Sequence, residues 1–343
     1  ERRIIDEDVR SDKVRREDVT LAYKYLLRRM PESEEVIQYH INNAATVESL
    51  VDGFIASEEF QRRYKNDFKK KDTDITAIEI YEKAKSVMPF VSVADAHGYR
   101  WLFNSKDTVI SDGMFWNQGK SHQKDDIDLF FFLSEKYYYR NGLEDGIFLD
   151  IGGNIGTTSI PIKKERRFVT KVIAFEPSAD NCRVFSANCA INDLDIGKDI
   201  VLENIGISNV NGMSELILSE NNMGDHRVCL DPNKAKKEGN YEQIELKTLE
   251  KYFSGQQMPF EEVKYIWVDT QGHEGFVLDG AKELLLTGNI PLLIEFWPDE
   301  MRRVGGLDLL LSTLKETYAD FIDIGRYRSG EGARPIEELS SLA

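Results

Sequence analysis

The 343 residues carry 44 lysines and arginines against 60 aspartates and glutamates, a net charge of −16, and 41% of them are hydrophobic. This hydrophobic share is ordinary for a globular protein with a proper core, and the length favours two domains. The acidic charge argues against nucleic acid and an anionic membrane surface as partners, because both are negatively charged themselves.

The pattern predicts a small helical unit over residues 18–64. Apolar residues of its first helix share one stripe: Leu21, Tyr25, Leu26 and Met30. Pro31 is expected to break that helix, and Thr46 is the expected N-cap of a later one. The polar, charged stretch at 65–74 predicts a linker.

Three further elements are expected before the main domain. Residues 75–88 predict a helix that ends at Pro89. Residues 99–112 predict a β-hairpin around a polar turn. Residues 125–141 predict a strongly apolar, aromatic helix, whose phenylalanine run at 130–132 is expected to be core.

From residue 146 onward, strand-like and helical segments alternate. The predicted strands are 147–152, 171–177, 199–208, 264–270, 291–297 and 319–325. The predicted helices are 154–162, 178–193, 273–288 (closed by Gly288) and 307–318. This alternation predicts a doubly wound, mostly parallel α/β sheet. Residues 208–253 interrupt it with two alternating runs, and we expect an inserted hairpin or flap there.

The first of these strands runs into a glycine-rich turn, FLDIGGNIGTTS, at residues 148–159. A triphosphate-binding loop needs GxxxxGK[ST], and no lysine stands at the required place. A dinucleotide-binding loop needs GxGxxG, but Asn154 occupies the position of its second glycine. The carboxylate of Asp150 would also repel a pyrophosphate. Both observations argue against NAD.

The same turn suits S-adenosylmethionine, which carries an ammonium and a sulfonium group and no phosphate. In the DxGxxxG pattern, Asp150 matches the amino group, and Gly152 and Gly156 allow the backbone to approach the methionine part. Asn154, between the two glycines, is a further candidate for binding the cofactor. Glu176, at the end of the second strand, is placed to accept both ribose hydroxyls. The structural alternative is that Asp150 caps the following helix and Glu176 ends a solvated strand.

Several segments, in this order, resemble the FkbM family of S-adenosylmethionine-dependent methyltransferases: FLDIGGNIGTTSI, VIAFEPSADNCRVFSANCAIND, NIGISNVNG, and IWVDTQGHEGFVLDGA followed by LLIEF. The resemblance runs from about Phe148 to Glu295. It implies a class I methyltransferase (Rossmann-like) fold and O-methylation, commonly of sugar or polyketide hydroxyls, with S-adenosylhomocysteine as product. Many members have Glu where this chain has Gln271, which makes position 271 a poor candidate for a general base.

The segment at about 16–64, AYKYLLRRMPES…LVDGFIASEEFQRRY, is similar to a small helical module. That module is found beside glycosyltransferases and methyltransferases of surface-polysaccharide assembly, and it ends in S-x-E-F, here Ser57, Glu59 and Phe60. The resemblance points to a sugar or glycan acceptor. Two roles are open for the module: docking to a protein partner or a second copy, or a plain helical appendage.

Three acids follow strand ends and are expected at the carboxyl edge of the sheet, where ligands bind in doubly wound folds: Asp150, Asp269 and Glu295. Methyl transfer to oxygen depends mostly on positioning, and a weakly acidic hydroxyl benefits from a base. Asp269 is the first candidate for the base or for orienting the acceptor. His273, at a helix start, and His226, in the insertion, are further catalytic candidates. For His273 the alternative is a histidine that only caps the helix or is exposed.

Other residues are candidates for binding. Arg227 is a candidate for an anionic part of the acceptor, and Glu295 and Trp297 for acceptor contacts, with core packing as the alternative for Trp297. Asn204, at the end of the third strand, is expected to contact adenine. Asp269, Glu295, His226 and His273 could together hold a divalent cation, but their spacing is no metal signature, so no metal site is predicted.

The three cysteines, Cys182, Cys189 and Cys229, are odd in number and form no CxxC pair. We therefore expect reduced thiols in a cytoplasmic protein rather than a disulfide framework. No apolar run approaches the length of a transmembrane segment, so none is expected.

Together these patterns predict an S-adenosylmethionine-dependent O-methyltransferase acting on a sugar or glycan hydroxyl. A small all-α N-terminal domain at 1–70 would be followed by a connecting region at 71–145 and a seven-stranded-type α/β domain at 146–343. A non-catalytic scaffold of a polysaccharide assembly complex and an NAD-dependent oxidoreductase are the alternatives.

Overall fold

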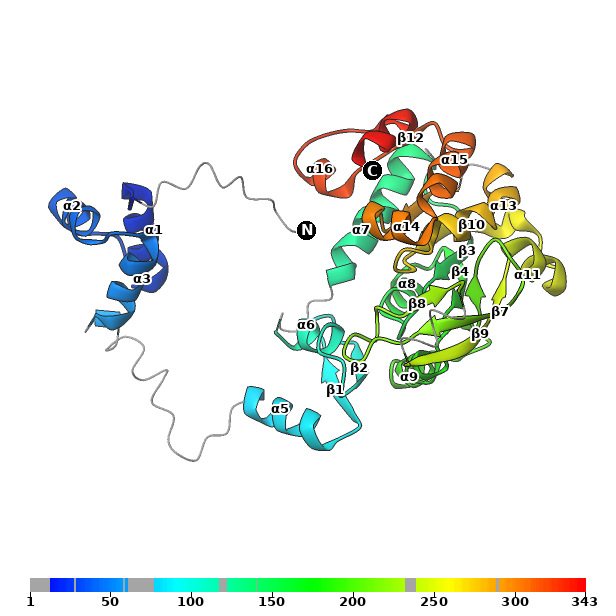
Figure 1. The fold of residues 1–343 in the computed structure, drawn as a ribbon, viewed down its shortest axis with the longest axis horizontal. Helices are drawn as coiled ribbons and strands as arrows, with labels where there is room; N and C mark the ends of the chain where they lie inside the picture. Colours follow the sequence, from blue (N-terminus) through cyan, green and yellow to red (C-terminus); the bar gives the residue numbers. More distant parts are fainter. Residues whose placement is uncertain are drawn as a thin grey trace. The chain divides into compact units, whose positions relative to one another are not determined.

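The computed structural model describes residues 13–27, 29–57, 59–60, 77–116, 122–139, 141–231, 239–287 and 290–343. The chain divides into two compact units, 1–80 and 81–343 (Figure 1), and each has its own hydrophobic core. The expected linker at 65–74, and with it the expected boundary at residue 70, lies outside the described residues.

The described part of the first unit is built from three short helices: α1 (Arg16–Leu26), α2 (Glu34–Asn43) and α3 (Val47–Ala56). Tyr23 of α1 connects the other two helices. Its ring packs edge-on against Phe54 with centroids 4.8 Å apart, and its hydroxyl lies 3.3 Å from Nε2 of His40. Aromatic packing therefore joins all three helices around one side chain.

The buried side of α1 differs from the predicted stripe. The structure buries Val19, Ala22, Tyr23 and Leu27. Leu21 and Met30 are exposed instead, and Met30 lies beyond the end of the helix. Both sets have helical spacing, so periodicity alone could not choose the side that faces α2 and α3. The prediction for Thr46 is confirmed, because its side chain accepts the backbone N–H of Ser49 at the start of α3.

The region between the helical unit and the main sheet differs most from the prediction made from the sequence. The predicted helix is α5 (Ala77–Val87), but the hairpin comes earlier than predicted and pairs β1 (Phe90–Ala94) with β2 (Arg100–Asn104). The stretch expected as its second strand begins α6 (Ile110–Trp116) instead. Asp107 causes this, because its Oδ1 accepts three successive backbone N–H groups, those of residues 109–111, at 2.7–3.1 Å.

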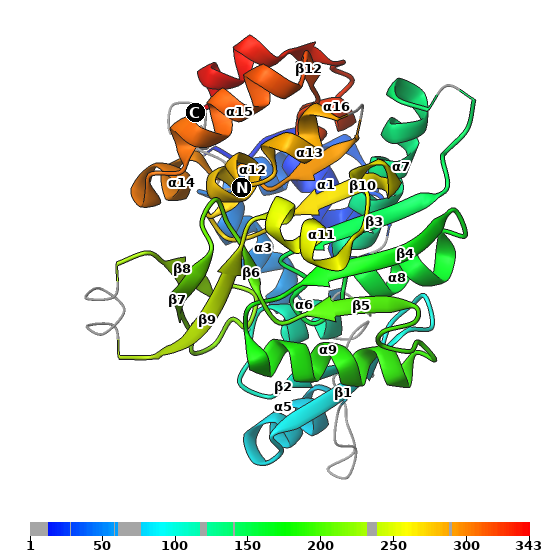
Figure 2. The ribbon, with the colours of Figure 1, turned by 90° about the vertical axis from the view of Figure 1, so that its right-hand side faces the viewer.

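Five parallel strands form the central sheet, in the order β11–β10–β3–β4–β5 (Figure 2). Their bounds are β3 (Gly146–Ile151), β4 (Val169–Phe175), β5 (Ile200–Glu203), β10 (Val263–Val268) and β11 (Leu292–Ile294). Because every pairing is parallel, all five carboxyl ends lie at the same edge. The predicted Rossmann-like, doubly wound α/β fold is confirmed.

Helices cover both faces of this sheet. In β3, Leu149 and Ile151 belong to one core and Phe148 to the other, as the alternation of a strand requires. The first core is covered by α11 (Leu249–Gln256), α12 (Glu274–Asp279), α13 (Lys282–Leu286) and α15 (Leu307–Thr317). The second is covered by α7 (His122–Tyr137), α8 (Ser159–Glu165) and α9 (Ala179–Ile191). Within α7, Phe130 and Phe131 are core as predicted, whereas Phe132 is exposed.

Two details of the α/β pattern are corrected. The predicted helix at 273–288 is two helices, α12 and α13, because the carbonyl of Gly280 between them accepts the N–H of Leu249 at the start of α11. Gly288 lies outside the described residues. The sheet has five strands rather than seven among the described residues, since the last predicted strand supplies β12 (Asp320–Phe321), which pairs only with β13 (Arg334–Pro335).

The remaining C-terminal elements are α14 (Pro298–Val304), α16 (Ile324–Arg328) and a 3₁₀ helix at Ile336–Leu342. In the part of the chain that the structure describes, no helix combines the length and apolar character needed to cross a membrane.

The interruption of the α/β pattern contains most of a second, four-stranded sheet. Its order is β6–β9–β7–β8, with β6 (Gly206–Ile207), β7 (Gly212–Ile217), β8 (Arg227–Cys229) and β9 (Tyr241–Lys247). The predicted third strand, 199–208, is therefore divided. Its first part is β5 of the central sheet, and its last part is β6 of the small one.

The glycine turn after β3 offers a test of packing at the sheet edge. Gly152 has φ +94°, and a Cβ there would lie 1.8 Å from the carbonyl oxygen of Asp269. Gly142 has a similar φ of +102° but open space around it. We expect Gly142→Ala to lower the free energy of unfolding by about 1 kcal/mol, through backbone strain alone. Gly152→Ala should cost about 3 kcal/mol or more, because two strand ends must separate.

Urea unfolding of both variants and the wild type measures this difference. Equal losses of stability would show that the approach of β3 and β10 is not tightly constrained.

Candidate active site

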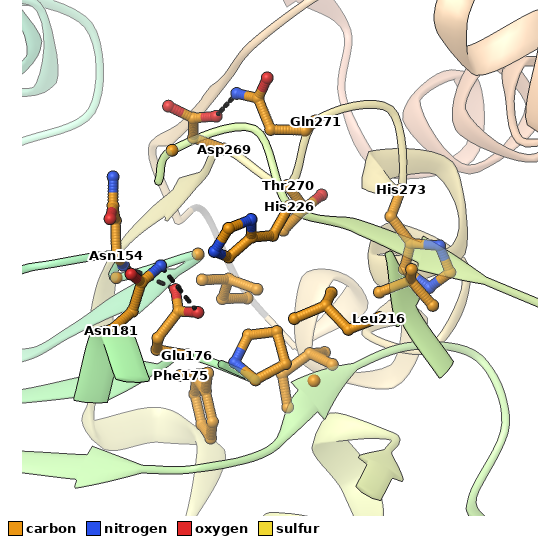
Figure 3. A pocket seen from close by; sticks show the side chains of 18 of the residues that line it. Asn154, Phe175, Glu176, Asn181, Leu216, His226, Asp269, Thr270, Gln271 and His273 are labelled. Atoms are coloured by element: carbon orange, nitrogen blue, oxygen red, sulfur yellow. Dashed lines mark hydrogen bonds between the residues drawn. The ribbon is translucent and has the colours of Figure 1, made fainter. Parts of the chain in front are cut away.

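A cavity opens at the carboxyl ends of β3, β4 and β10, and the small sheet forms its opposite wall (Figure 3). Six predicted site residues line it: Gly152, Asn154, Glu176, His226, Asp269 and His273. Six others do not: Asp150, Gly156, Asn204, Arg227, Glu295 and Trp297. The cavity lies where a doubly wound sheet places its ligands.

The glycine turn is tied to the end of the neighbouring strand. The backbone N–H groups of Gly152 and Gly153 both donate to the carbonyl of Phe175 at 2.9 Å. Asn154 follows with φ +48°, a left-handed conformation that asparagine tolerates better than most residues. Its backbone N–H donates to Oε2 of Glu176 at 2.8 Å. The turn therefore presents backbone to the cavity with no side chain at positions 152 and 153.

Glu176 is a buried carboxylate that lines the cavity. It accepts backbone N–H groups from Asn154 and Ser178, each at 2.8 Å. Burial raises the pKa of Glu176 to about 8, against the lowering effect of these hydrogen bonds. A ligand that brings hydroxyl donors to the ionised carboxylate would replace part of the lost hydration.

Two further polar atoms in the cavity wall have no hydrogen-bond partner among the described residues. They are Oδ1 of Asn154 and Oγ1 of Thr270, and both are buried. Buried polar atoms are nearly always paired in proteins, so these two indicate a polar ligand. The described lining contains no lysine or arginine, whereas Glu176 and Asp269 contribute carboxyl groups that a cationic ligand would favour in the ionised form. The cavity therefore suits a cationic, phosphate-free ligand better than a pyrophosphate.

Three residues predicted to bind the cofactor have structural roles in this fold. Asp150 is buried at the end of β3 and accepts a hydrogen bond from the hydroxyl of Ser159, the first residue of α8. Burial raises the pKa of Asp150 to about 7. The side-chain amide of Asn204 donates to the carbonyls of residues 176 and 177 at 3.0 and 2.8 Å. Gly156 makes room for the ring of Phe185, which a Cβ would approach to 2.8 Å.

His226 lines the cavity from the loop before β8 and lies between Glu176 and Thr270 in Figure 3. Its Nδ1 accepts the backbone N–H of Ser219 at 3.1 Å. An N–H group can only donate, so Nδ1 carries the lone pair and the neutral ring carries its proton on Nε2. Burial lowers the pKa of His226, which favours this neutral form. The ring is therefore placed to donate a hydrogen bond into the cavity rather than to remove a proton.

His273 reaches only the margin of the cavity. It is buried, its Nε2 lies 3.0 Å from the hydroxyl of Ser208, and its ring stacks on Phe276. Burial lowers the pKa of His273 to about 4. These contacts give it a packing role between α12 and the chain that follows β6, in place of the predicted catalytic one.

Asp269 ends β10 and faces a second acid across the sheet edge. The side-chain amide of Gln271 donates to Asp269 at 2.7 Å and to Glu295 at 3.1 Å, and so bridges the two carboxylates. Gln271 has φ +54°, and the sharp turn at this position brings its amide back toward the end of β10. Burial raises the pKa of Asp269.

Arg227 and Trp297 contact each other outside the cavity lining. The guanidinium carbon of Arg227 lies 5.2 Å from the ring centroid of Trp297. Its nitrogens pair with Asp225 at 2.7 Å and with Glu300 at 2.8 Å. The charge of Arg227 is thus already compensated, which weakens its candidacy for binding an anionic acceptor group. Trp297 remains 40% exposed.

Sequence reasoning missed a chain of contacts that holds the cavity wall. Oδ2 of Asp107 accepts the backbone N–H of Met223 at 3.1 Å, and the Met223 carbonyl accepts the side-chain amide of Asn181 at 2.9 Å. Met223 and Asn181 both line the cavity. An aspartate just before a helix is a signal that could have revealed the role of Asp107. It was missed because the same residues were predicted to form a hairpin. Glu274 was missed too, because it stands in a helical segment without a motif of its own.

Comparison with known families decides the class of this domain. Residues 150–317 match the model of the methyltransferase FkbM domain. These residues are an FkbM methyltransferase domain. A crystal structure of an FkbM methyltransferase from Methylobacillus flagellatus KT is 17% identical with a TM-score of 0.34, and the match covers 52% of this chain and 40% of that one. No curated protein sequence matches.

The contact between Asp107 and Met223 joins the hairpin region to the FkbM methyltransferase domain, and it can be tested directly. Asp107→Ala leaves four backbone N–H groups without their acceptor, so we expect the free energy of unfolding to fall by about 3 kcal/mol. Asp145→Ala removes an exposed carboxylate just before β3 and should change stability by less than about 0.5 kcal/mol. Thermal or urea unfolding measures both variants. A loss below about 1 kcal/mol for Asp107→Ala would contradict the assigned role.

Proposed function

We propose that this protein is an S-adenosylmethionine-dependent O-methyltransferase that acts on a hydroxyl of a sugar or glycan. The match of residues 150–317 to the FkbM methyltransferase domain supports methyl transfer. The observation that carries the cofactor is the cavity at the ends of β3, β4 and β10. It combines a strand-end carboxylate, Glu176, with unpaired polar atoms and with no lysine or arginine in the described lining.

The residues of the cavity fit the groups of this cofactor. Glu176 would accept the ribose hydroxyls, and the side chains of Asn154 and Thr270 offer the unpaired oxygens for its polar parts. The backbone at Gly152 permits close approach, since no side chain stands there. When bound, S-adenosylmethionine supplies an electrophilic methyl group. The same wall would leave the phosphates of NAD without a cationic partner, which weighs against the oxidoreductase alternative.

The residues around Asp269 would position the acceptor. Asp269 lines the cavity at the end of β10, and a carboxylate there can accept the hydrogen of an acceptor hydroxyl and fix its direction. His226 would donate from Nε2 to an oxygen of either ligand. In-line alignment of this kind is the main contribution that a protein makes to methyl transfer. The apolar side chains of Leu216 and Met223, which also line the cavity, would help to exclude water.

Two features of the chain favour a sugar or glycan as the acceptor. The resemblance of residues 16–64 to a module of polysaccharide-assembly enzymes favours a glycan, and we propose that this unit docks to a partner or to a second copy. Trp297, with Glu295 two residues before it, remains a proposed sugar contact. A cytoplasmic location is part of the same proposal, in keeping with free thiols at Cys182, Cys189 and Cys229.

Binding of S-adenosylhomocysteine to the full chain tests the cofactor. By calorimetry we expect binding by the wild type and no binding of NADH. Glu176→Gln keeps the size of the side chain but loses its charge, and should weaken binding about tenfold to a hundredfold. Glu203→Gln is the matched control, because Glu203 ends the neighbouring strand β5 but does not line the cavity. Equal affinity in both variants, or preference for NADH, would overturn the cofactor assignment.

Transfer of a labelled methyl group to a panel of free sugars, nucleotide sugars and glycans tests the reaction. Asp269→Asn should lower turnover on an accepted substrate by about a hundredfold, with the affinity for S-adenosylhomocysteine nearly unchanged, because it removes a positioning group rather than a cofactor contact. Unchanged turnover would rule out that role for Asp269. A wild type that binds the cofactor but methylates none of the panel would instead favour the scaffold alternative.

A further inference from the structure

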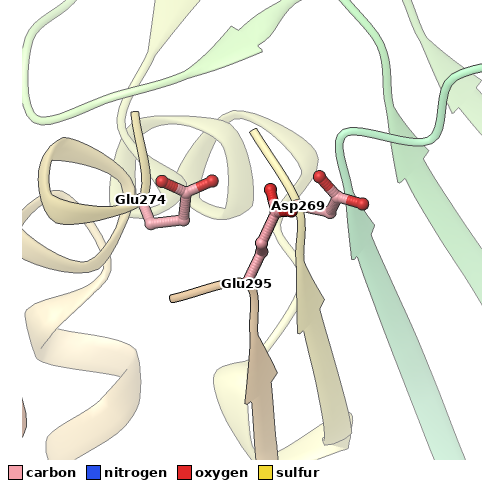
Figure 4. A group of neighbouring side chains, drawn as sticks. All are labelled: Asp269, Glu274 and Glu295. Carbon is pink, nitrogen blue, oxygen red and sulfur yellow. The ribbon is translucent and has the colours of Figure 1, made fainter. Parts of the chain in front are cut away.

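Three carboxylates from separate elements meet beside the cavity. Asp269 follows β10, Glu295 follows β11, and Glu274 is the first residue of α12. One oxygen from each lies within 4.8 Å of the others, and Figure 4 shows the three side chains next to one another at the ends of the strands. Acids are placed together in this way by the fold, since nothing in their sequence spacing brings them close.

Glu274 distinguishes this group from an ordinary acidic surface. It is fully buried, with 0% of its surface exposed. Its Oε1 accepts the backbone N–H groups of Thr270 and Gly272, at 2.8 and 3.3 Å. Its Oε2 is buried and has no hydrogen-bond partner among the described residues. An unpaired, buried carboxylate oxygen is costly unless a ligand pairs with it.

Among the described residues, two arginines of neighbouring segments have other acidic partners. Arg227 pairs with Asp225 and Glu300, and Arg303 pairs with Glu300. The amide of Gln271 donates to Asp269 and Glu295, but it is neutral and gives nothing to Glu274. Carboxylates crowded together in this way repel one another unless a cation lies between them.

We infer that Asp269, Glu274 and Glu295 bind one divalent cation of the hard, oxygen-preferring class, such as Mg²⁺ or Mn²⁺. All three ligands are carboxylate oxygens, and the group contains no cysteine or histidine of the kind that zinc and copper favour. Three protein oxygens leave coordination positions for water or for another ligand. The backbone N–H groups that hold Oε1 of Glu274 would orient this ligand.

A cation at this site would also take part in the proposed methyl transfer, and this role of the ion rests on the proposed function. Because Asp269 also lines the cavity, the ion would lie at its edge and could hold and polarise the acceptor hydroxyl. The two histidines do not offer a base there, since Nδ1 of His226 is engaged by Ser219 and His273 is buried against Ser208. A bound cation would lower the pKa of the hydroxyl without such a base.

Binding of Mn²⁺ to the full chain, after removal of metals with a chelator, tests the inference. Free Mn²⁺ is measured by electron paramagnetic resonance during titration, with Mg²⁺ as competitor. The wild type should bind one ion, and Glu274→Gln and Glu295→Gln should each weaken binding about tenfold or more. Asp299→Asn is the matched control, because it removes a nearby carboxylate that is 91% exposed and pairs with Arg302. Its affinity should equal that of the wild type.

Folding and cofactor binding are measured on the same samples. Glu274→Gln retains an oxygen for the N–H groups of Thr270 and Gly272, and Glu295 lies at the surface, so circular dichroism should show both variants folded. Absence of Mn²⁺ binding by the wild type, or equal binding by wild type and both variants, overturns the inference. If Mn²⁺ binds as expected but S-adenosylhomocysteine does not, the cation site stands and the proposed function fails. The reverse result leaves the function and removes the cation.

Discussion

One buried carboxylate connects the parts of this site. Glu176 ends β4, receives the N–H of Asn154 from the turn after β3, and receives the N–H of Ser178 at the start of α9. Its own backbone carbonyl accepts the amide of Asn204, which follows β5. The ends of three adjacent strands are therefore fixed relative to one residue, through its carboxylate and its backbone carbonyl. Without that acceptor, the turn would have to find other partners for N–H groups that are buried in the fold. The position of the cavity wall depends on this arrangement.

The charges around the cavity likewise depend on which side chains pair with one another. Acids dominate the cavity and its margin, while the arginines nearby are paired with other acids. Such a site can hold its carboxylates ionised only when positive charge is supplied from outside. A sulfonium-bearing cofactor on one side and a divalent cation on the other would each supply part of that charge. Each would offset part of the repulsion among the carboxylates.

The sequence predicted correctly the elements whose residues repeat a simple apolar pattern. The predictions failed where hydrogen-bond partners determine the local structure. Every strand of the central sheet was found, because buried parallel strands are short apolar runs between helices. The hairpin was misplaced because Asp107 acts through three N–H groups that are only visible in three dimensions. Glu176 and Asp269 lie in the cavity as expected from strand ends, whereas Asp150 points to Ser159 instead. A strand alternates its side chains between faces, so an acid near its end can lie on either side of the ligand. The role of Glu274 could not be predicted, because what distinguishes it is a buried carboxylate oxygen without a hydrogen-bond partner among the described residues.

Strand β3 shares its hydrophobic core with elements that precede it, so the folded domain begins earlier than the family match. Phe148 is fully buried and belongs to the same cluster as Phe130, Phe131 and Trp101, all of which precede the stretch that matches the FkbM family. That stretch begins within β3, at Asp150, and so cuts through the central strand of the sheet. The segment that matches the family is thus shorter than the segment that can fold. A recombinant fragment cut at residue 150 would expose an aromatic surface, whereas one that begins at the start of the second unit would keep its core intact.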